Sequence, residues 1–160
     1  MTARRSKLLA ISSLLFALVS LSGFAQEAIN VSEGRAWGVG MQVGLPYGGL
    51  ISVRSWLSPG LGLEGILFFS GGIYDMEGTL SARALYRASD ATTTDFYIAA
   101  GATLPLEEQT LTVSVVGGIE FGFRLAPVLA WNIEFGASYA LDGEFNMAIG
   151  TGVHYYFPAY

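Results

Sequence analysis

The sequence predicts an all-β protein: an eight-stranded antiparallel up-and-down transmembrane β-barrel. The first observation is the stretch 110–125, whose odd positions are apolar or glycine and whose even positions are mostly small or polar. A period of two is that of a strand, because successive side chains point to opposite sides of the pleat. The second is that the polar face carries Gly, Ser and Thr with isolated charges, which suits a narrow interior, so the apolar face would point outward into a bilayer. The third is that all five prolines lie at the ends of predicted strands, where a missing N–H leaves the ladder intact.

The first 25 residues have the features of a secretory signal peptide. A basic start is followed by an apolar run over 8–21 and by small residues up to Ala25, where we expect cleavage. The alternative is an N-terminal membrane anchor, but the run is short for a span of about 20 residues. A polar leader is expected at 26–35.

Composition sets further bounds. The chain has 160 residues, which suggests one domain, and only 13% are charged, against about 25% in soluble proteins. Beyond residue 25 the sequence has no lysine, five arginines and 13 acidic residues. The exported chain would therefore be strongly acidic and a poor nucleic-acid binder. The absence of cysteine excludes disulfides, thiolate metal sites and a lipid-accepting cysteine.

The barrel is predicted over 36–157. Its first four strands each alternate apolar and polar positions: 37–45, 50–57, 61–69 and 78–87. They are joined by a Pro-Tyr-Gly-Gly turn at 46–49, a Ser-Pro-Gly turn at 58–60 and a loop at 71–77.

The last four strands continue this alternation: 96–104, 110–125, 129–141 and 145–157. A polar connection is expected at 88–95, a loop at 105–109, and turns at Pro127 and at 142–144. Residues 158–160 form a C-terminal tail. An even strand number returns both termini to the same side, as bacterial single-chain barrels require.

The charged residues separate a membrane barrel from a soluble one. In these registers no Arg, Asp or Glu inside a strand lies on the apolar face, where an Arg at mid-depth would cost about 2–4 kcal/mol. A secreted soluble ligand-binding barrel, which stays an alternative, should carry Lys and Glu outside. The predicted inward set is Arg54, Glu64, Arg83, Arg87, Glu120, Arg124, Glu134 and His154.

Hairpin positions predict neighbours within this set. A turn at Pro59 puts Arg54 opposite Glu64. A turn centred on Pro127 puts Glu120 opposite Glu134, with Arg83 or Arg54 between the two carboxylates because like charges repel. A turn near Gly143 puts His154 beside Asn132. Because eight strands leave an interior just wide enough for side chains, we expect a network that plugs the lumen; the alternative is a polar conduit or gate.

Aromatic side chains are expected at both ends of the outward face, as two interfacial belts. The end near the termini is predicted to hold Trp37, Tyr86, Phe96, Phe123, Trp131, Tyr155 and Phe157, and the other end Phe69, Tyr139 and Phe145.

No motif predicts chemistry. The Gly-x-Gly-x-x-Gly spelling at 60–65 opens a strand, whereas a dinucleotide site needs it to open a helix. His154 lacks a recognisable nucleophile, orienting acid or clustered ligands, so we expect no catalytic residue, metal or other cofactor. The connections away from the termini are short, which argues against a large displayed binding site.

The end of the chain, 150–157, resembles the last strand of bacterial outer-membrane barrels, with Gly152, Tyr155 and Phe157 at the places of the assembly signal. The chain continues to Tyr160, so Phe157 and Tyr160 both stay candidates for the terminal residue. The whole barrel resembles the small OmpA-, OmpX- and OmpW-like class, and a poorly characterised subgroup that shares the motifs at 44–49 and 56–59. The resemblance implies export by the general secretory pathway, periplasmic chaperones, the barrel-assembly machinery, and insertion among outer-membrane lipids.

The sequence thus predicts a non-enzymatic, monomeric outer-membrane protein with a structural or membrane-organising role. Three alternatives stay open: a small passage for ions or apolar solutes, a barrel enzyme acting on lipid through His154, and the soluble ligand-binding barrel.

Overall fold

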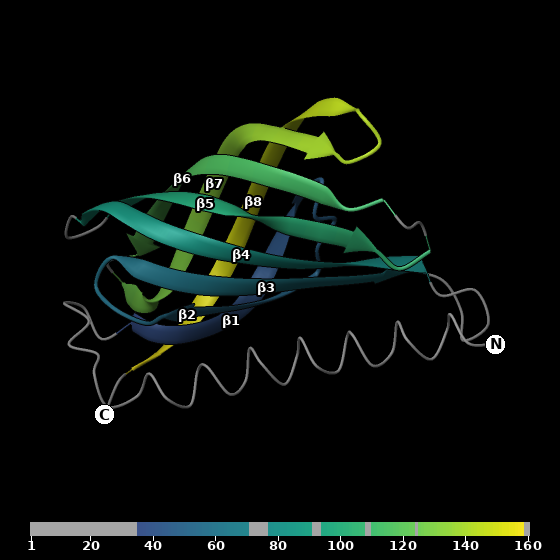
Figure 1. Ribbon diagram of the computed structural model, residues 1–160. Coiled ribbons are helices and arrows are strands. Elements are labelled where there is room, and N and C mark those ends of the chain that lie inside the picture. Colours follow the sequence, from purple (N-terminus) through teal and green to yellow (C-terminus); the bar gives the residue numbers. More distant parts are fainter. Residues whose placement is uncertain (1–34, 71–76, 91–93, 108–109, 124, 159–160) are drawn as a thin grey trace.

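The computed structural model describes residues 35–70, 77–90, 94–107, 110–123 and 125–158. Eight strands form one closed barrel in chain order (Figure 1). They are β1 (Arg35–Leu45), β2 (Ile51–Trp56), β3 (Leu61–Ser70), β4 (Glu77–Asp90), β5 (Thr94–Pro105), β6 (Thr112–Phe123), β7 (Ala126–Ala140) and β8 (Phe145–Pro158). The predicted all-β, eight-stranded antiparallel up-and-down barrel is confirmed. Within the described residues, no helix is long and apolar enough to cross a membrane.

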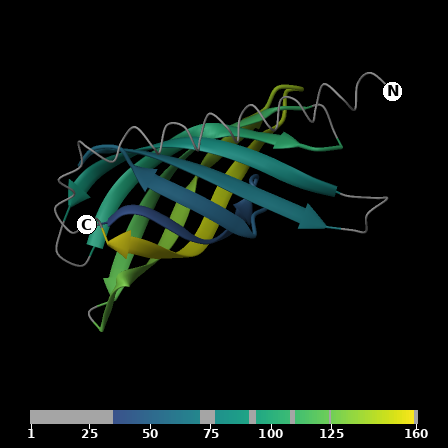
Figure 2. The same ribbon diagram turned by 90° about the horizontal axis from the view of Figure 1, so that it is seen from below.

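The barrel closes because β1 pairs with β8 along its whole length, from Arg35 opposite Pro158 to Leu45 opposite Ile149. Figure 2 shows these two strands, the first and the last of the chain, side by side. Every strand therefore has a partner on both sides, which removes the unpaired edge that an open sheet would expose.

Several strands are longer than the apolar pattern predicted. β1 starts at Arg35, inside the expected leader, and β4 and β5 take up most of the expected polar connection at 88–95. The backbone ladder needs no apolar side chain, so strands continue into polar sequence, and a bulge between Arg87 and Ser89 keeps β4 paired with β5. The expected signal peptide, the leader up to residue 34 and residues 159–160 lie outside the described residues.

The two faces of the sheet have the predicted polarity. In β6, Val113 and Val115 are 40% and 57% exposed, whereas Ser114 and Glu120 point inside and are buried. Among strand residues whose side chains are described, the only exposed charge is Glu77, the first residue of β4. The apolar core lies inside the barrel and consists of Trp56, Leu85, Tyr97, Ala99, Val116, Ala130, Ala148 and Tyr156.

A tight turn after β1 folds one side chain into the barrel. Gly44 N donates to Gly48 O at 2.8 Å, and Gly48 and Gly49 have positive φ angles of 59° and 95°. A Cβ on Gly49 would lie 1.7 Å from the carbonyl oxygen of Gln42, so only glycine fits there. The turn leaves Tyr47 fully buried inside the barrel.

Candidate functional site

Glu64 is the centre of a rung that three neighbouring strands form inside the barrel. It pairs with Arg54 on β2, as predicted, and with Arg83 on β4. Arg54 Nη2 lies 3.1 Å from Glu64 Oε1, and Arg83 Nη2 makes a close contact with Glu64 Oε2. Ser52 donates its hydroxyl to Glu64 Oε1 at 2.7 Å. One carboxylate is thus held between two guanidinium groups by charge-assisted hydrogen bonds.

Glu134, on β7, accepts hydrogen bonds from side chains on β1, β4 and β5 and from the turn after β1. Arg83 binds it with Nη1 and Nη2, at 2.6 and 3.0 Å. The hydroxyl groups of Tyr47 and Tyr97 each donate to it at 2.6 Å, and Gln42 Nε2 donates at 3.1 Å. Arg83 therefore joins Glu64 to Glu134 across the lumen.

Glu120, on β6, is bound by Arg54 Nη1 at 2.6 Å and by the Tyr156 hydroxyl at 2.9 Å. Arg54 Nη2 also lies 3.8 Å from Glu134 Oε1, so this arginine does lie between the two carboxylates. The expected register was wrong, because Glu120 is opposite Asn132 and Glu134 is opposite Gly118. The pairing shifts between Gly122 and Phe123, so the hairpin is not centred on Pro127.

A second group of charges lies nearer the chain termini. Arg87 Nη2 is 3.5 Å from Asp95 Oδ2, and Arg35 Nη1 is 3.9 Å from the same oxygen and 3.7 Å from Glu120 Oε1. The sequence reasoning missed Arg35 and Asp95, which it assigned to the leader and to a connection. Extending the strand alternation by one residue would have found Asp95. It would have placed Arg35 on the outward face with Trp37, because a register shift between Arg35 and Trp37 turns Arg35 inward.

His154 lies inside the barrel, but not beside Asn132 as expected. It is opposite Ala130, because the turn after β7 pairs Tyr139 with Phe145 and is centred one residue earlier than Gly143. Its Nε2 is 2.9 Å from Ser52 Oγ and 3.3 Å from Glu64 Oε1. A catalytic triad needs the acid on the other ring nitrogen, and Nδ1 has no hydrogen-bond partner in the described structure. All three side chains are fully buried, so the group has neither the geometry nor the access for nucleophilic catalysis.

The described lumen charges balance. The lumen holds four arginines and four carboxylates, each at most 8% exposed. They are Arg35, Arg54, Arg83 and Arg87, and Glu64, Asp95, Glu120 and Glu134. Each arginine also lies over an aromatic ring, with centroid distances from 4.1 to 5.6 Å, on Trp56, Tyr47, Tyr97 and Tyr156. Cation–π contacts are strongest in such desolvated positions. Arg124, the remaining predicted member, lies outside the described residues.

Glycines on neighbouring strands make room for these large side chains. A Cβ on Gly118 would lie 2.3 Å from Tyr97 Cζ, and one on Gly150 would lie 2.0 Å from the Tyr47 hydroxyl. Similar close approaches pair Gly38 with Tyr156, Gly40 with His154, Gly62 with Trp56, Gly101 with Arg83, and Gly122 with Arg35. The interior is therefore filled by side chains that pack directly on the opposite or adjacent backbone.

The three residues of the expected assembly signal lie on β8. Gly152 is buried beside Gln42, whereas Tyr155 is 42% exposed on the outer face. Phe157 stacks on Trp37 of β1 with ring centroids 4.1 Å apart. This contact links the last strand to the first at the point where the barrel closes.

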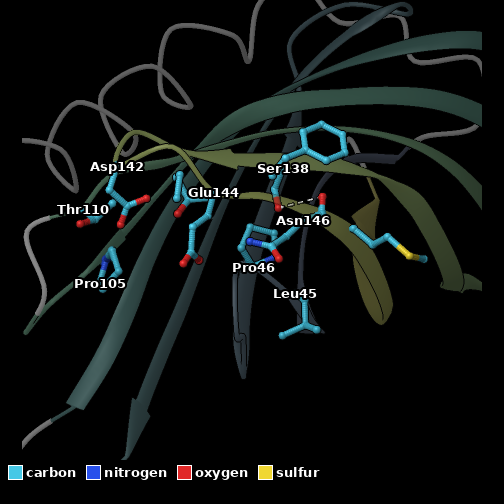
Figure 3. A pocket seen from close by; sticks show the side chains of 12 residues that line it. Leu45, Pro46, Pro105, Thr110, Ser138, Asp142, Glu144 and Asn146 are labelled. Carbon is cyan, nitrogen blue, oxygen red and sulfur yellow. Dashed lines mark hydrogen bonds between the residues drawn. The ribbon is translucent and has the colours of Figure 1, made fainter.

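A cavity of about 730 Å³ lies at the barrel mouth away from the chain termini (Figure 3). Its lining residues come from the ends of β1, β5 and β7, the starts of β6 and β8, and the turn at 141–144: Leu45, Pro46, Pro105, Thr110, Thr112, Ser138, Ala140, Asp142, Glu144, Phe145, Asn146 and Met147. Across the described ranges, no three His, Cys, Asp or Glu side chains are grouped so that they could hold a metal ion.

No protein-family model matches the chain, and no curated protein matches it. Function therefore has to be inferred from the residues and their geometry.

Proposed function

We propose that the chain is a bacterial outer-membrane β-barrel with a structural or membrane-organising role and a plugged lumen. The observation that carries the proposal is the inverted polarity of the barrel. Large apolar side chains such as Val53, Ile98 and Phe135 are 48–59% exposed, while the charges inside the strands are buried. A soluble barrel would leave this outer surface in water, whereas a bilayer takes it up without cost.

Strand length and closure support the same proposal. A transmembrane strand needs about 9–11 residues. Seven strands have 10–15 residues, and only β2 is shorter, with 6. In the hydrocarbon region each backbone N–H and C=O group must find a hydrogen-bond partner within the protein. In a closed barrel the neighbouring strands supply these partners for every strand.

The outward aromatic residues support the position in the membrane. At the end near the termini, Trp37 is 42% exposed, Tyr86 60% and Phe96 48%. At the other end Tyr139 and Phe145 are opposite each other on β7 and β8, and are 42% and 73% exposed. Aromatic side chains at both ends, Trp and Tyr among them, suit the two membrane interfaces.

The neutral, crowded network favours a plug over the alternative passage for ions or small solutes. An open passage needs water-accessible charges, and Arg54, Glu64 and Glu134 are fully buried. The buried Ser52–His154–Glu64 contact likewise gives no support to a lipid-acting enzyme. The proposal includes export by an N-terminal signal peptide, delivery by periplasmic chaperones and insertion by the barrel-assembly machinery.

The first test is a heat-modifiable gel shift of the chain lacking residues 1–25, refolded in detergent micelles and in buffer alone. A compact, boiling-sensitive band that requires detergent is expected. A monodisperse, folded protein in buffer without detergent would refute the membrane location and favour the secreted soluble barrel.

The second test is conductance in planar bilayers. A plugged barrel should give no steady unitary current, and Arg83→Ala with Glu134→Ala should raise the current because both remove atoms from the middle of the lumen. Steady conductance of the unchanged protein would favour the passage instead.

A further inference from the structure

The wall of the barrel is much lower at β2 than elsewhere. β2 has 6 residues, its neighbours β1 and β3 have 11 and 10, and β4 to β8 have 12–15. In Figure 1, β2 lies between β1 and β3. With a rise of about 3.3 Å per residue and a tilt of about 45°, β2 is about 14 Å tall, and β4 to β8 are about 28–35 Å tall. A transmembrane strand needs about 9–11 residues, so β2 by itself is too short to span a bilayer.

The pairing registers show which end of β2 is short. From Ser52 on β2, paired residues lead one way round the barrel to Thr112 on β6, and the other way to Gly122. Strand tilt raises one route as much as it lowers the other, so Ser52 lies at the height of Gly117, halfway between these two residues. From that height β2 extends only to Ile51 towards the mouth away from the termini, whereas β6 extends to Thr112, so the wall over β2 is about 9 Å lower. The residues along the two routes are Ile66, Ser81 and Thr103, and Gly40, His154 and Ala130.

Turns fix the length of β2 at both ends. On the mouth side, residues 46–50 fold into the barrel instead of extending its wall, because Tyr47 is fully buried and donates its hydroxyl to Glu134 at 2.6 Å. On the other side, Leu57 N donates to Leu61 O at 2.8 Å and closes a tight turn. The low wall is therefore part of the fold.

The outer surface of β2 cannot match a bilayer of full thickness. Ile51 and Val53 are both 49% exposed, and Leu50, which precedes the strand, is 44% exposed. Irregular backbone does not face lipid within the hydrocarbon region, because its N–H and C=O groups lack the partners of a ladder. The edge of the hydrocarbon must therefore lie near Ile51 beside β2. A short apolar stretch is accommodated by thinning of the bilayer or by snorkelling basic side chains, and the outward residues of β2 include no lysine or arginine.

We propose that the barrel thins the bilayer beside β2, by drawing the lipid headgroups of the mouth-side leaflet down to the turn at 46–50. The lipids beside β4 to β8 keep the full thickness, so the barrel imposes a step in membrane height between its two sides. This inference rests on the proposed membrane location and specifies the membrane-organising role. The partner is phospholipid, and the change is in the thickness of one leaflet.

The test is the depth of spin labels on the whole exported chain in phosphatidylcholine vesicles with chains of 16 to 18 carbons. The chain has no cysteine, so Ile51→Cys and Val115→Cys each give one labelled site. Both positions face outward, at about the same height on opposite walls. A flat bilayer would place the two labels at equal depth, as measured by their accessibility to oxygen and to a water-soluble nickel complex. We expect the Ile51 label to be shallower by at least about 5 Å, because about 9 Å of wall is missing above it.

A matched pair of sites controls for tilt of the whole barrel. Ala82→Cys on β4 and Ile149→Cys on β8 are each two strands from β2. Paired residues lead from Ala82 to Phe145 and to Tyr155, so it lies at the height of residue 150, beside Ile149. These two labels should have equal depth. In vesicles of lipids with twelve-carbon chains, the difference between the Ile51 and Val115 labels should fall to less than about half, because less thinning is needed there.

Three results would overturn the proposal: equal depth of the Ile51 and Val115 labels, an equally large difference within the control pair, or a difference that does not fall in the thinner bilayer. The heat-modifiable gel shift checks that every variant folds. A wrong membrane location would give a different result, with all four labels accessible to the nickel complex and no detergent-dependent band.

Discussion

Replacing Glu64 by glutamine tests the lumen network at the carboxylate that both Arg54 and Arg83 bind. The change keeps the side-chain shape but removes one negative charge that two guanidinium groups share, Arg54 Nη2 at 3.1 Å and Arg83 Nη2 in closer contact. Glu64 is fully buried, so water cannot compensate, and four arginines are left with three carboxylates. Breaking a buried ion pair on one side costs about 3–5 kcal/mol. We expect a loss of this size in the free energy of unfolding.

The assay is reversible urea unfolding in lipid vesicles, followed by tryptophan fluorescence. Ser81→Ala is the control for a neutral lumen hydrogen bond, since Ser81 Oγ is 2.8 Å from Thr103 Oγ1, and should cost about 0.5–1.5 kcal/mol. Adding Arg83→Met to Glu64→Gln restores charge balance, so the double variant should be more stable than the sum of the single changes by about 0.5–3 kcal/mol. A Glu64→Gln protein no less stable than Ser81→Ala, or strict additivity in the double variant, would refute the reasoning.

Three further predictions use the same unfolding assay. Gly118→Ala should destabilise by about 1–3 kcal/mol, because its Cβ would overlap an aromatic ring held in the lumen. A Cβ at Gly117 would make only an ordinary contact, 3.9 Å from the Phe135 carbonyl oxygen, so Gly117→Ala should change stability by less; equal effects would contradict the packing. Val115→Arg puts a charge on a 57% exposed outer position and should cost about 2–4 kcal/mol in lipid; no cost in lipid would argue against a bilayer around β6. Tyr47→Phe removes a 2.6 Å bond to a buried carboxylate and should cost about 1.5–3 kcal/mol, whereas the outward Tyr155→Phe should cost much less; the reverse order would contradict the network.

The sequence determined the strands and their faces. A period of two in eight successive segments, with prolines at their ends, was enough to predict the eight-stranded barrel. The inward positions of Arg54, Glu64 and Arg83 predicted the side on which the charges lie. This works because alternation is local: it depends only on where successive Cβ atoms point along one strand. The Pro59 turn also fixed one register, that of Arg54 and Glu64.

The tertiary structure decided which charges meet. Two hairpins paired two residues away from the expected register. A bulge near Gly122 shifts the first pairing, and a turn centred one residue earlier than Gly143 shifts the second. A shift of two keeps each side chain on its face but changes its neighbour, so alternation cannot detect it. Contacts across the lumen, such as Arg83 with Glu134 and Tyr47 with Glu134, join residues that are 51 and 87 positions apart in the chain. These contacts exist only once the sheet has closed, because closure brings side chains from different strands of the barrel within hydrogen-bond distance. No local conformational preference of the chain can do this.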